Sequence, residues 1–358
     1  MKTWDVIVIG GGIIGLSLAI ELRKHGAQVL VVERGQPGRE ASHAAAGMLA
    51  DCGLEIPAAL QTLATASARM YPEFAHELQE SGIRVDLRDQ GTILFLPSKD
   101  TADFSIAQLR QEQLSELEPA LAETNRPAIY LEERSVDPRA LTLAALKAAK
   151  HREVDIASGT AVTGVLASDG RATGVRTDKT IYNAPVVVNC AGAWAGQLPP
   201  HHFPTRPVKG QMLSIVGGPA IEHVVRSSEI YLVPRSDGRL LIGATVEESG
   251  YDKRTNAESI QHMFEAAVRL VPALAQARRQ EIWAGLRPGT PDDLPILGAT
   301  STPGYFVATG HFRDGILLAP VTAHLMAQVV SGEKADYDLS AFSPQRFRGE
   351  SFDSRSKL

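Results

Sequence analysis

Arg287 lies in a stretch whose neighbours hold its backbone in place, "AGLRPGTPDDLPILG" (284–298). A proline restricts the residue before it to an extended backbone, so Pro288 fixes the conformation at Arg287. A guanidinium held in this way can bind a carboxylate through two parallel hydrogen bonds. That carboxylate belongs either to a bound acid or to a neighbouring side chain, for which Asp292 and Asp293 are the candidates.

A second pattern that is typical of ligand binding is formed by Gly10, Gly12 and Gly15. Gly10 permits a tight turn, Gly12 lets a pyrophosphate approach the backbone, and Gly15 lets a helix pack on the preceding strand. The helix N-terminus offers N–H groups and a partial positive charge to the phosphates. Glu33 is placed to accept a hydrogen bond from a ribose 2′-hydroxyl, which disfavours NADP. The pattern predicts a dinucleotide site; the alternative is a glycine-rich turn in another βαβ unit.

The elements that would position this site can also be predicted. Val6–Ile9 and Val29–Val32 are continuous apolar runs, as in parallel strands that are buried on both faces. Between them, Ile13–His25 has the helical period and ends at Gly26, a common residue just after a helix. This strand–helix–strand unit predicts an α/β fold that contains a Rossmann-like domain.

The segment "EASHAAAGMLA" (40–50) would lie against the same ligand. Ser42 can donate a hydrogen bond to a phosphate. Small residues such as Ala46 and Gly47 let the backbone come close to a flat, bulky group. The alternative is the start of a tightly packed helix.

A second strand–turn–helix unit is predicted near the C-terminus. A short apolar strand falls within residues 304–310, and an apolar helix is predicted over Ile316–Val330 with Asp314 as its N-cap. A helix N-terminus aimed at a bound cofactor would stabilise negative charge on it. A buried core helix with an ordinary cap is the alternative interpretation.

The composition indicates a soluble, globular protein with room for two domains. The chain has 358 residues, of which 44% are hydrophobic and 22% are charged. The net charge of -5 argues against non-specific binding of nucleic acid. Cys52 and Cys190 are far apart, and the adjacent His201 and His202 form a lone pair, so the sequence predicts no metal site.

The sequence predicts a cytoplasmic protein without a transmembrane segment. The apolar run over residues 6–20 is too short to span a bilayer and contains glycines. It also lacks the basic region and the cleavage site of a signal peptide. The chain ends in Ser-Lys-Leu, the peroxisomal address, but a chance ending of a polar tail is the favoured interpretation.

These motifs together resemble the D-amino-acid oxidase superfamily of FAD enzymes. The resemblance extends over nearly all of residues 4–332 and is greatest to the glycine oxidases of the ThiO type, which are linked to thiamine biosynthesis. Besides the stretches above, it rests on "VDPRAL" (136–141), "VVVNCAGAWAG" (186–196), "RPVKGQML" (206–213), "YLVPRSDGRLLIGAT" (231–245) and "GHFRDGILLAPVTA" (310–323).

The resemblance implies a bound FAD. The FAD is expected to be non-covalent, because neither cysteine lies near the arginine stretch, where sarcosine oxidases carry a flavin-linking cysteine. The implied FAD-binding residues are Gly10, Gly12, Ile13, Ile14, Gly15, Glu33, Arg34, Ser42, Ala46, Gly47, Met48, Val162, Ala191, Gly192, Trp194, His311, Phe312, Arg313, Asp314, Gly315, Ile316 and Leu317.

The resemblance also implies a substrate site above the flavin. Arg287 and Tyr231 would hold the substrate carboxylate, and Arg313 would be a further polar residue there. The alternatives are a packed strand aromatic for Tyr231 and a charge on a surface turn for Arg313. His311 is expected to be a packed histidine and not a catalytic base.

Three positions bear on the choice of substrate. Glu229 stands where glycine oxidases have a histidine, and Val246 replaces a methionine that lines the pocket in that branch. Gly53 falls where a small gating residue is expected. Since Val246 and Gly53 are not bulky, the pocket is expected to admit substrates larger than glycine.

The implied architecture is a discontinuous FAD-binding domain covered by a mixed-sheet substrate domain. The FAD-binding domain is predicted over residues 1–80, 136–200 and 283–335, and the substrate domain over 81–135 and 201–282. Residues 336–358 would form a C-terminal tail. The family also implies a homo-oligomer, often a tetramer.

The implied reaction is the oxidative deamination of glycine, small amines or D-amino acids. Hydride transfer from Cα to flavin N5 would give an imine, which water converts to a 2-oxo acid and ammonia, while oxygen becomes hydrogen peroxide. The imine would be available for the thiazole of thiamine. The alternatives are a D-amino-acid dehydrogenase that uses a quinone, an oxidase of sarcosine or other secondary amines, and a protein that binds FAD without catalysis.

Overall fold

Apolar runs from both ends of the chain meet in a six-stranded sheet in the computed structural model, which describes residues 3–52, 56–96 and 108–347. All pairs in this sheet are parallel except that of the antiparallel edge strand β18. In spatial order the strands are β18 (Ile296–Ala299), β19 (Tyr305–Thr309), β12 (Val186–Asn189), β1 (Val6–Ile9), β2 (Val29–Val32) and β8 (Asp155–Ala157).

Both faces of this sheet are covered, which is why its strands β1 and β2 are apolar at every position. Val6 and Val8 point into one core and Ile7 and Ile9 into another, because successive strand residues face opposite sides. The first core is shared with α1 (Ile13–Lys24), α3 (Gln61–Gln79), α5 (Pro138–His151) and α7 (Ala319–Val330). The second lies under a small antiparallel sheet of β9 (Val162–Ser168), β10 (Arg171–Thr177) and β11 (Ile181–Asn183).

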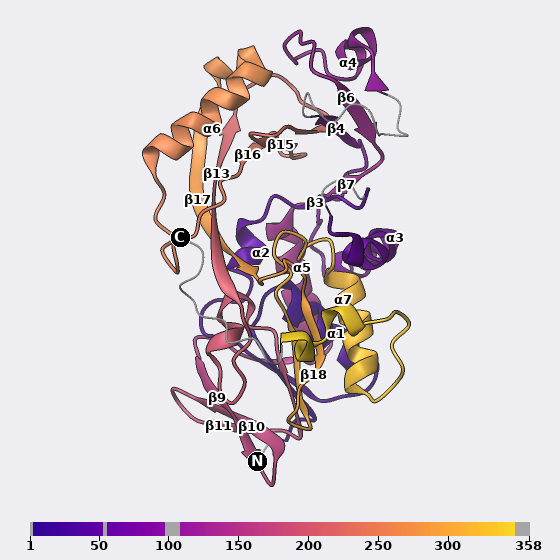
Figure 1. Ribbon diagram of the computed structural model, residues 1–358, viewed down its shortest axis with the longest axis vertical. Coiled ribbons are helices and arrows are strands. Elements are labelled where there is room, and N and C mark those ends of the chain that lie inside the picture. The colour runs from indigo at the N-terminus through magenta and orange to yellow at the C-terminus, as the bar shows by residue number, and fades with distance from the viewer. Residues whose placement is uncertain (1–2, 53–55, 97–107, 348–358) are drawn as a thin grey trace.

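A second, mixed sheet of eight strands lies beside the first unit in the described part of the chain (Figure 1). Its β14 and β4 are parallel and its other pairs antiparallel. The strands in spatial order are β17 (Arg278–Gly289), β13 (Arg206–Val216), β16 (Leu240–Gly243), β15 (Tyr231–Pro234), β14 (Val224–Arg226), β4 (Thr92–Phe95), β6 (Ala128–Leu131) and β5 (Gln108–Leu109).

The two faces of the mixed sheet have different partners. The amphipathic helix α6 (Ala257–Leu270) buries Ile260 and Met263 against the outer face. On the inner face, Met212 and Leu241 pack near Ala46, which places this face toward the first unit. The remaining elements are α2 (Ala41–Ala44), α4 (Gln111–Leu117), the pair β3 (Met48–Leu49) and β7 (Arg134–Ser135), and 3-10 turns at Ala58–Leu60, Gly192–Gln197, Pro272–Gln276, Ser340–Phe342 and Pro344–Phe347.

The predicted α/β fold class is confirmed, since the structure consists of a Rossmann-like unit and a mixed-sheet unit. Both N-terminal strands have the predicted bounds, and α1 ends one residue earlier than predicted, before a left-handed Gly26. The prediction for α7 was wrong at its start. The helix begins at Ala319 because Pro320 favours the first helical turn, and Asp314 is not its N-cap.

One predicted domain boundary differs from the observed sheet. Residue 283 falls inside β17, which pairs with β13 without interruption from Arg278 to Gly289 apart from one register shift. The antiparallel pairing of β17 with β13 continues across the expected boundary. Arg287 therefore lies near the end of a strand of the mixed sheet.

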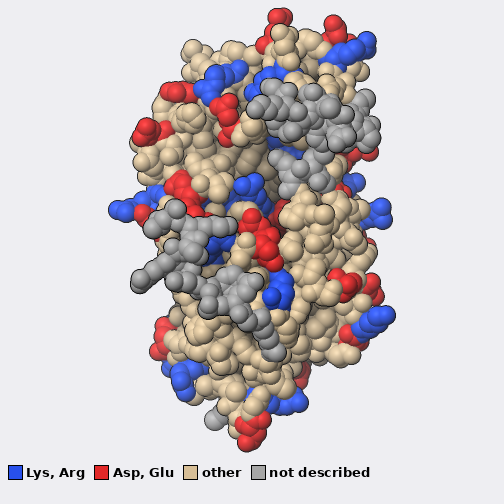
Figure 2. Space-filling model, in the orientation of Figure 1, with Lys and Arg blue, Asp and Glu red and all other residues tan. Residues whose placement is uncertain are grey.

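The surface bears charges of both signs. Acidic and basic side chains are interspersed over the face shown in Figure 2, as a net charge of -5 would allow. Among the helices of the described residues, none is long and apolar enough to cross a membrane.

Candidate active site

A cavity of about 630 Å³ lies between the two units. One wall consists of residues that follow the carboxyl ends of β1, β2, β12 and β19, which is where open α/β sheets bind ligands. The opposite wall is the inner face of the mixed sheet, with residues of β13, β15, β16 and β17. The volume is of the size expected for an organic ligand.

The end of the cavity at α1 is suited to phosphates. Helix α1 begins at Ile13 without a side-chain cap on Gly12, and the Ile13 N–H donates to Ser42 Oγ at 3.0 Å. A Cβ at Gly10 would overlap the carbonyl oxygen of Cys190, and one at Gly15 would overlap the carbonyl oxygen of Gly10. Only glycines therefore permit this close approach of backbone to backbone, which leaves the helix N-terminus open to an anion.

Beside the phosphate end, Glu33 is fixed by the backbone. Its carboxylate accepts N–H hydrogen bonds from Gly11 and Gly35, each at 2.8 Å, through different oxygens. Since each carboxylate oxygen has a second lone pair, Glu33 can still accept from a ribose hydroxyl. Arg34 stacks 3.5 Å from the ring centroid of Trp194 and continues this wall.

Nearly all the predicted FAD contacts line the cavity. The exceptions are Gly15, which packs α1 against the β1 turn, and Leu317, which is buried and accepts a hydrogen bond from Ser67 through its carbonyl. The lining residues are Gly10, Gly12, Ile13, Ile14, Glu33, Arg34, Ser42, Ala46, Gly47, Met48, Val162, Ala191, Gly192, Trp194, His311, Phe312, Arg313, Asp314, Gly315 and Ile316.

Arg287 reaches the cavity from the end of β17. Its Nη1 donates to the carbonyls of Thr245 at 3.1 Å and Lys209 at 3.4 Å. The predicted alternative, a pair with Asp292 or Asp293, is wrong. Arg346 binds Asp292 at 2.8 Å, and Arg206 lies 3.6 Å from Asp293. The guanidinium has five N–H donors, so capacity for a ligand carboxylate remains.

Tyr231 and Arg313 lie near Arg287. The Tyr231 hydroxyl is hydrogen-bonded to the Arg287 guanidinium and also points to Met212 Sδ, at 3.6 Å. Burial raises the pKa of Tyr231, against the smaller opposing effects of the two arginines, so the phenol stays protonated. Arg313 is exposed on one side but lines the cavity. The three groups form a cluster of donors at one end of the cavity.

Two glycines that the sequence analysis did not identify make room for this cluster. A Cβ at Gly210 would overlap the guanidinium of Arg287, and a Cβ at Gly243 would lie 2.6 Å from the hydroxyl oxygen of Tyr231. Both glycines are in strands that flank these residues across the sheet. Their importance could be read only from the strand register.

The three predicted pocket residues have different places. Glu229 lines the mouth of the cavity, and its carboxylate accepts from Arg269 at 2.5 Å. Val246 also lines the cavity and is 54% exposed. Gly53 lies outside the described residues.

His311 is buried beside the cavity and is not placed as a base. Its Nε2 is 3.1 Å from Thr322 Oγ1, and burial lowers its pKa to about 3. As the pH falls from the ordinary pKa of 6.5 toward about 3, His311 becomes protonated in the unfolded chain but stays neutral in the folded chain. The stability due to the neutral histidine is therefore complete above 6.5 and declines below it.

We expect His311→Gln to flatten the loss of stability in this acid range. The change should remove up to about 1.4 kcal/mol of pH dependence per pH unit, because one proton is no longer taken up on unfolding. Urea unfolding at several pH values between 4 and 7.5 (roughly, the titration range of this group) measures it. His202→Gln, at an exposed histidine, should keep the slope of the unchanged protein. Equal slopes for both variants would contradict the expectation.

The chain is similar to known proteins over nearly its whole length. The family model described as "FAD dependent oxidoreductase" (DAO) matches residues 5–329. The chain is 36% identical to the bifunctional protein ThiO/ThiG of Trichormus variabilis, over 97% of this chain but 55% of that protein. It is therefore about half as long as that relative. It is 34% identical to the glycine oxidase of Geobacillus kaustophilus, over 97% of this chain and 98% of the relative. The crystal structure of glycine oxidase from that organism superposes with a TM-score of 0.92, covering 98% of this chain and 100% of that one.

Proposed function

Since the chain belongs to the DAO family of FAD-dependent oxidoreductases, we propose that it oxidatively deaminates glycine and small amines or D-amino acids. One molecule of amino acid, one of oxygen and one of water would give a 2-oxo acid, ammonia and hydrogen peroxide. The observation that supports this proposal best is the cluster of Arg287, Tyr231 and Arg313 in the same cavity as the open N-terminus of α1 and Glu33.

The chain's own residues would hold FAD along the cavity. The α1 N-terminus and Ser42 would bind the pyrophosphate, and Glu33 the ribose. The flavin would lie between the segment Ala44–Met48 and the turn at His311–Ile316. Bound FAD supplies the acceptor for the two electrons and the hydrogen of the substrate Cα–H bond. We propose that FAD is held without a covalent link, since neither cysteine is on β17.

Arg287 and Tyr231 would fix the substrate by its carboxylate. Arg287 would donate two hydrogen bonds, as a guanidinium does to a carboxylate, and the protonated Tyr231 would donate a third. Holding the substrate at one end limits the directions in which its Cα–H can point. Orientation of this kind lowers the barrier without a proton transfer by the protein.

The substrate amine must lose its extra proton before the Cα–H bond can be broken as hydride. His311 is buried and bonded to Thr322, so it is not proposed as the base. The guanidinium groups of Arg287 and Arg313 would instead make a nearby ammonium less stable and so lower its pKa. The proton that leaves the substrate ammonium would pass to water, so no side chain would be needed to accept it.

We expect excess glycine to bleach the visible band of the yellow protein when oxygen is excluded. Admitting air should restore the band and produce hydrogen peroxide. A band that bleaches but recovers only with a quinone or dye would establish the dehydrogenase alternative. If glycine has no effect but sarcosine, D-alanine or D-proline bleaches the band, the substrate is a secondary amine or a larger amino acid. No reduction by any of them would favour FAD binding without catalysis.

A place for the product follows from the ThiO-type resemblance. We propose that the imine formed from glycine is used for the thiazole of thiamine, and the similarity to ThiO/ThiG proteins supports this. The homo-oligomer that the resemblance implies stays a prediction, and so does the cytoplasmic location.

A further inference from the structure

We propose that Arg235 is a positioning residue for the bound FAD, which it serves by fixing the peptide between Ala46 and Gly47 in the cavity wall. Arg235 follows β15 of the mixed sheet and donates through Nη2 to the carbonyl oxygen of Ala46. Both Ala46 and Gly47 line the cavity, whereas Arg235 does not. The inference concerns the cofactor and is independent of the substrate proposed above.

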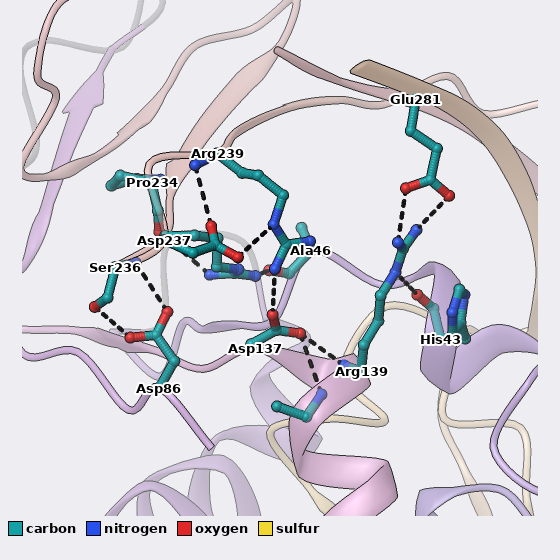
Figure 3. Close-up of polar contacts among 12 residues, drawn as sticks. His43, Ala46, Asp86, Asp137, Arg139, Pro234, Ser236, Asp237, Arg239 and Glu281 are labelled. Carbon is teal, nitrogen blue, oxygen red and sulfur yellow. Dashed lines mark hydrogen bonds and ion pairs between the residues drawn. The ribbon is translucent and has the colours of Figure 1, made fainter. Parts of the chain in front are cut away.

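Three side chains from other elements bind the backbone carbonyls of the segment 43–47, which forms part of the cavity wall. Arg139 Nε donates to His43 at 3.3 Å, Trp283 Nε1 to Ala44 at 3.1 Å, and Arg235 to Ala46. Figure 3 shows the contact of Arg139 with His43. Arg139 is itself held by a bidentate pair with Glu281, at 2.7 and 3.1 Å. The wall is therefore fixed from both the helix α5 and the mixed sheet.

Arg235 donates its hydrogen bonds to backbone carbonyls, and the nearby carboxylates of Asp137 and Asp86 interact with its charge without accepting a hydrogen bond from it. The side chain is only 4% exposed, where a guanidinium is normally paired with a carboxylate. Its hydrogen bonds go to Ala46 and to the carbonyl of Pro234, while the nearby Asp137 accepts from Arg239 at 2.7 Å. Among the described residues, Arg235 Nε has no hydrogen-bond partner.

Fixing the peptide between Ala46 and Gly47 also fixes the direction of the Gly47 N–H. The C=O and N–H of a planar trans peptide point in opposite directions, so holding the Ala46 oxygen directs the Gly47 N–H away from Arg235. Gly47 has a left-handed backbone, and its own carbonyl accepts from Val136 at 2.9 Å. A Cβ there would overlap the carbonyl oxygen of Val136. The N–H of Gly47 is thus a preorganised donor for an acceptor atom of FAD.

The test compares Arg235→Met with Arg239→Met. Arg239 belongs to the same network through Asp137 and Asp237 but is not bonded to the segment 43–47. FAD is titrated into the apoprotein to measure Kd, the reduction potential of the bound FAD is measured, and Tm is recorded. We expect Arg235→Met to raise Kd about tenfold or more, since an aligned, charge-assisted contact is lost. Its reduction potential should fall because a nearby cation no longer stabilises added electrons.

Arg239→Met should lower Tm but keep Kd within about twofold of the unchanged protein, because it leaves the Ala46 contact intact. Arg235→Lys keeps the charge and one donor, so it should restore much of the affinity. If Arg235→Met does not fold, Arg235→Gln takes its place with the same expectations. Kd and potential that match the unchanged protein, or an equal effect of Arg239→Met, would overturn the proposal. None of these measurements depends on turnover of glycine.

Discussion

Arg287→Ala is expected to lower kcat/KM for glycine by about 30- to 4,000-fold while FAD remains bound. Truncating one partner of a buried, hydrogen-bonded charge pair costs about 2–5 kcal/mol, and each 1.4 kcal/mol or so is tenfold in rate. The loss should fall on both KM and kcat, because the carboxylate contact binds the substrate and also orients its Cα–H. Since Arg287 belongs to the mixed-sheet wall of the cavity and the α1 N-terminus to the Rossmann-like wall, FAD affinity should change little.

Oxygen consumption with varied glycine gives kcat and KM, and the visible spectrum gives the FAD content. Arg279→Ala is the matched control, because Arg279 is an exposed arginine on the same strand, bonded to Gln261. It should leave kcat/KM within about twofold, as surface changes usually do. A normal rate for Arg287→Ala, or the same loss for Arg279→Ala, would remove Arg287 from the proposed substrate site.

The strand–helix–strand start of the fold could be predicted because its signals are local. Val6–Ile9 is apolar at every position, and the structure shows why: alternate residues enter two separate cores. The glycines and Glu33 lie within about one βαβ unit, so their meeting at a helix N-terminus follows from chain connectivity. Family resemblance then extended the prediction to residues far apart in the chain.

The surroundings of the arginine cluster could not be predicted, since they depend on strand register. Nothing in the sequence near Gly210 or Gly243 indicates that each glycine leaves room for a side chain of a neighbouring strand. The same limit explains the pairing of Asp292, which looks available to Arg287 in the sequence. In the fold it is held by Arg346, 54 residues away. Contacts between distant segments are fixed by packing and not by local pattern.

Gly15→Ala is expected to release FAD and to destabilise the fold. A Cβ at this position would overlap the carbonyl oxygen of Gly10, which is backbone and cannot rotate away. Gly10 cannot move either, because its left-handed backbone lies directly against the carbonyl of Cys190. Helix α1 must therefore shift from β1, and its N-terminus moves with it. Overpacking of this kind costs about 1–3 kcal/mol, so Kd for FAD should rise by about 10- to 100-fold.

FAD titration of the apoprotein and thermal unfolding test this result, with Gly26→Ala as the control at the other end of the same helix. Gly26 also has a left-handed backbone, but a Cβ there meets nothing within 4 Å. Alanine at such a site costs about 1 kcal/mol or more through backbone strain, so Gly26→Ala should lose stability yet keep its affinity for FAD. Wild-type affinity in Gly15→Ala would show that the phosphate site tolerates a shifted helix. A parallel loss of affinity in both variants would show that FAD responds to general destabilisation of α1 and not to the position of its N-terminus.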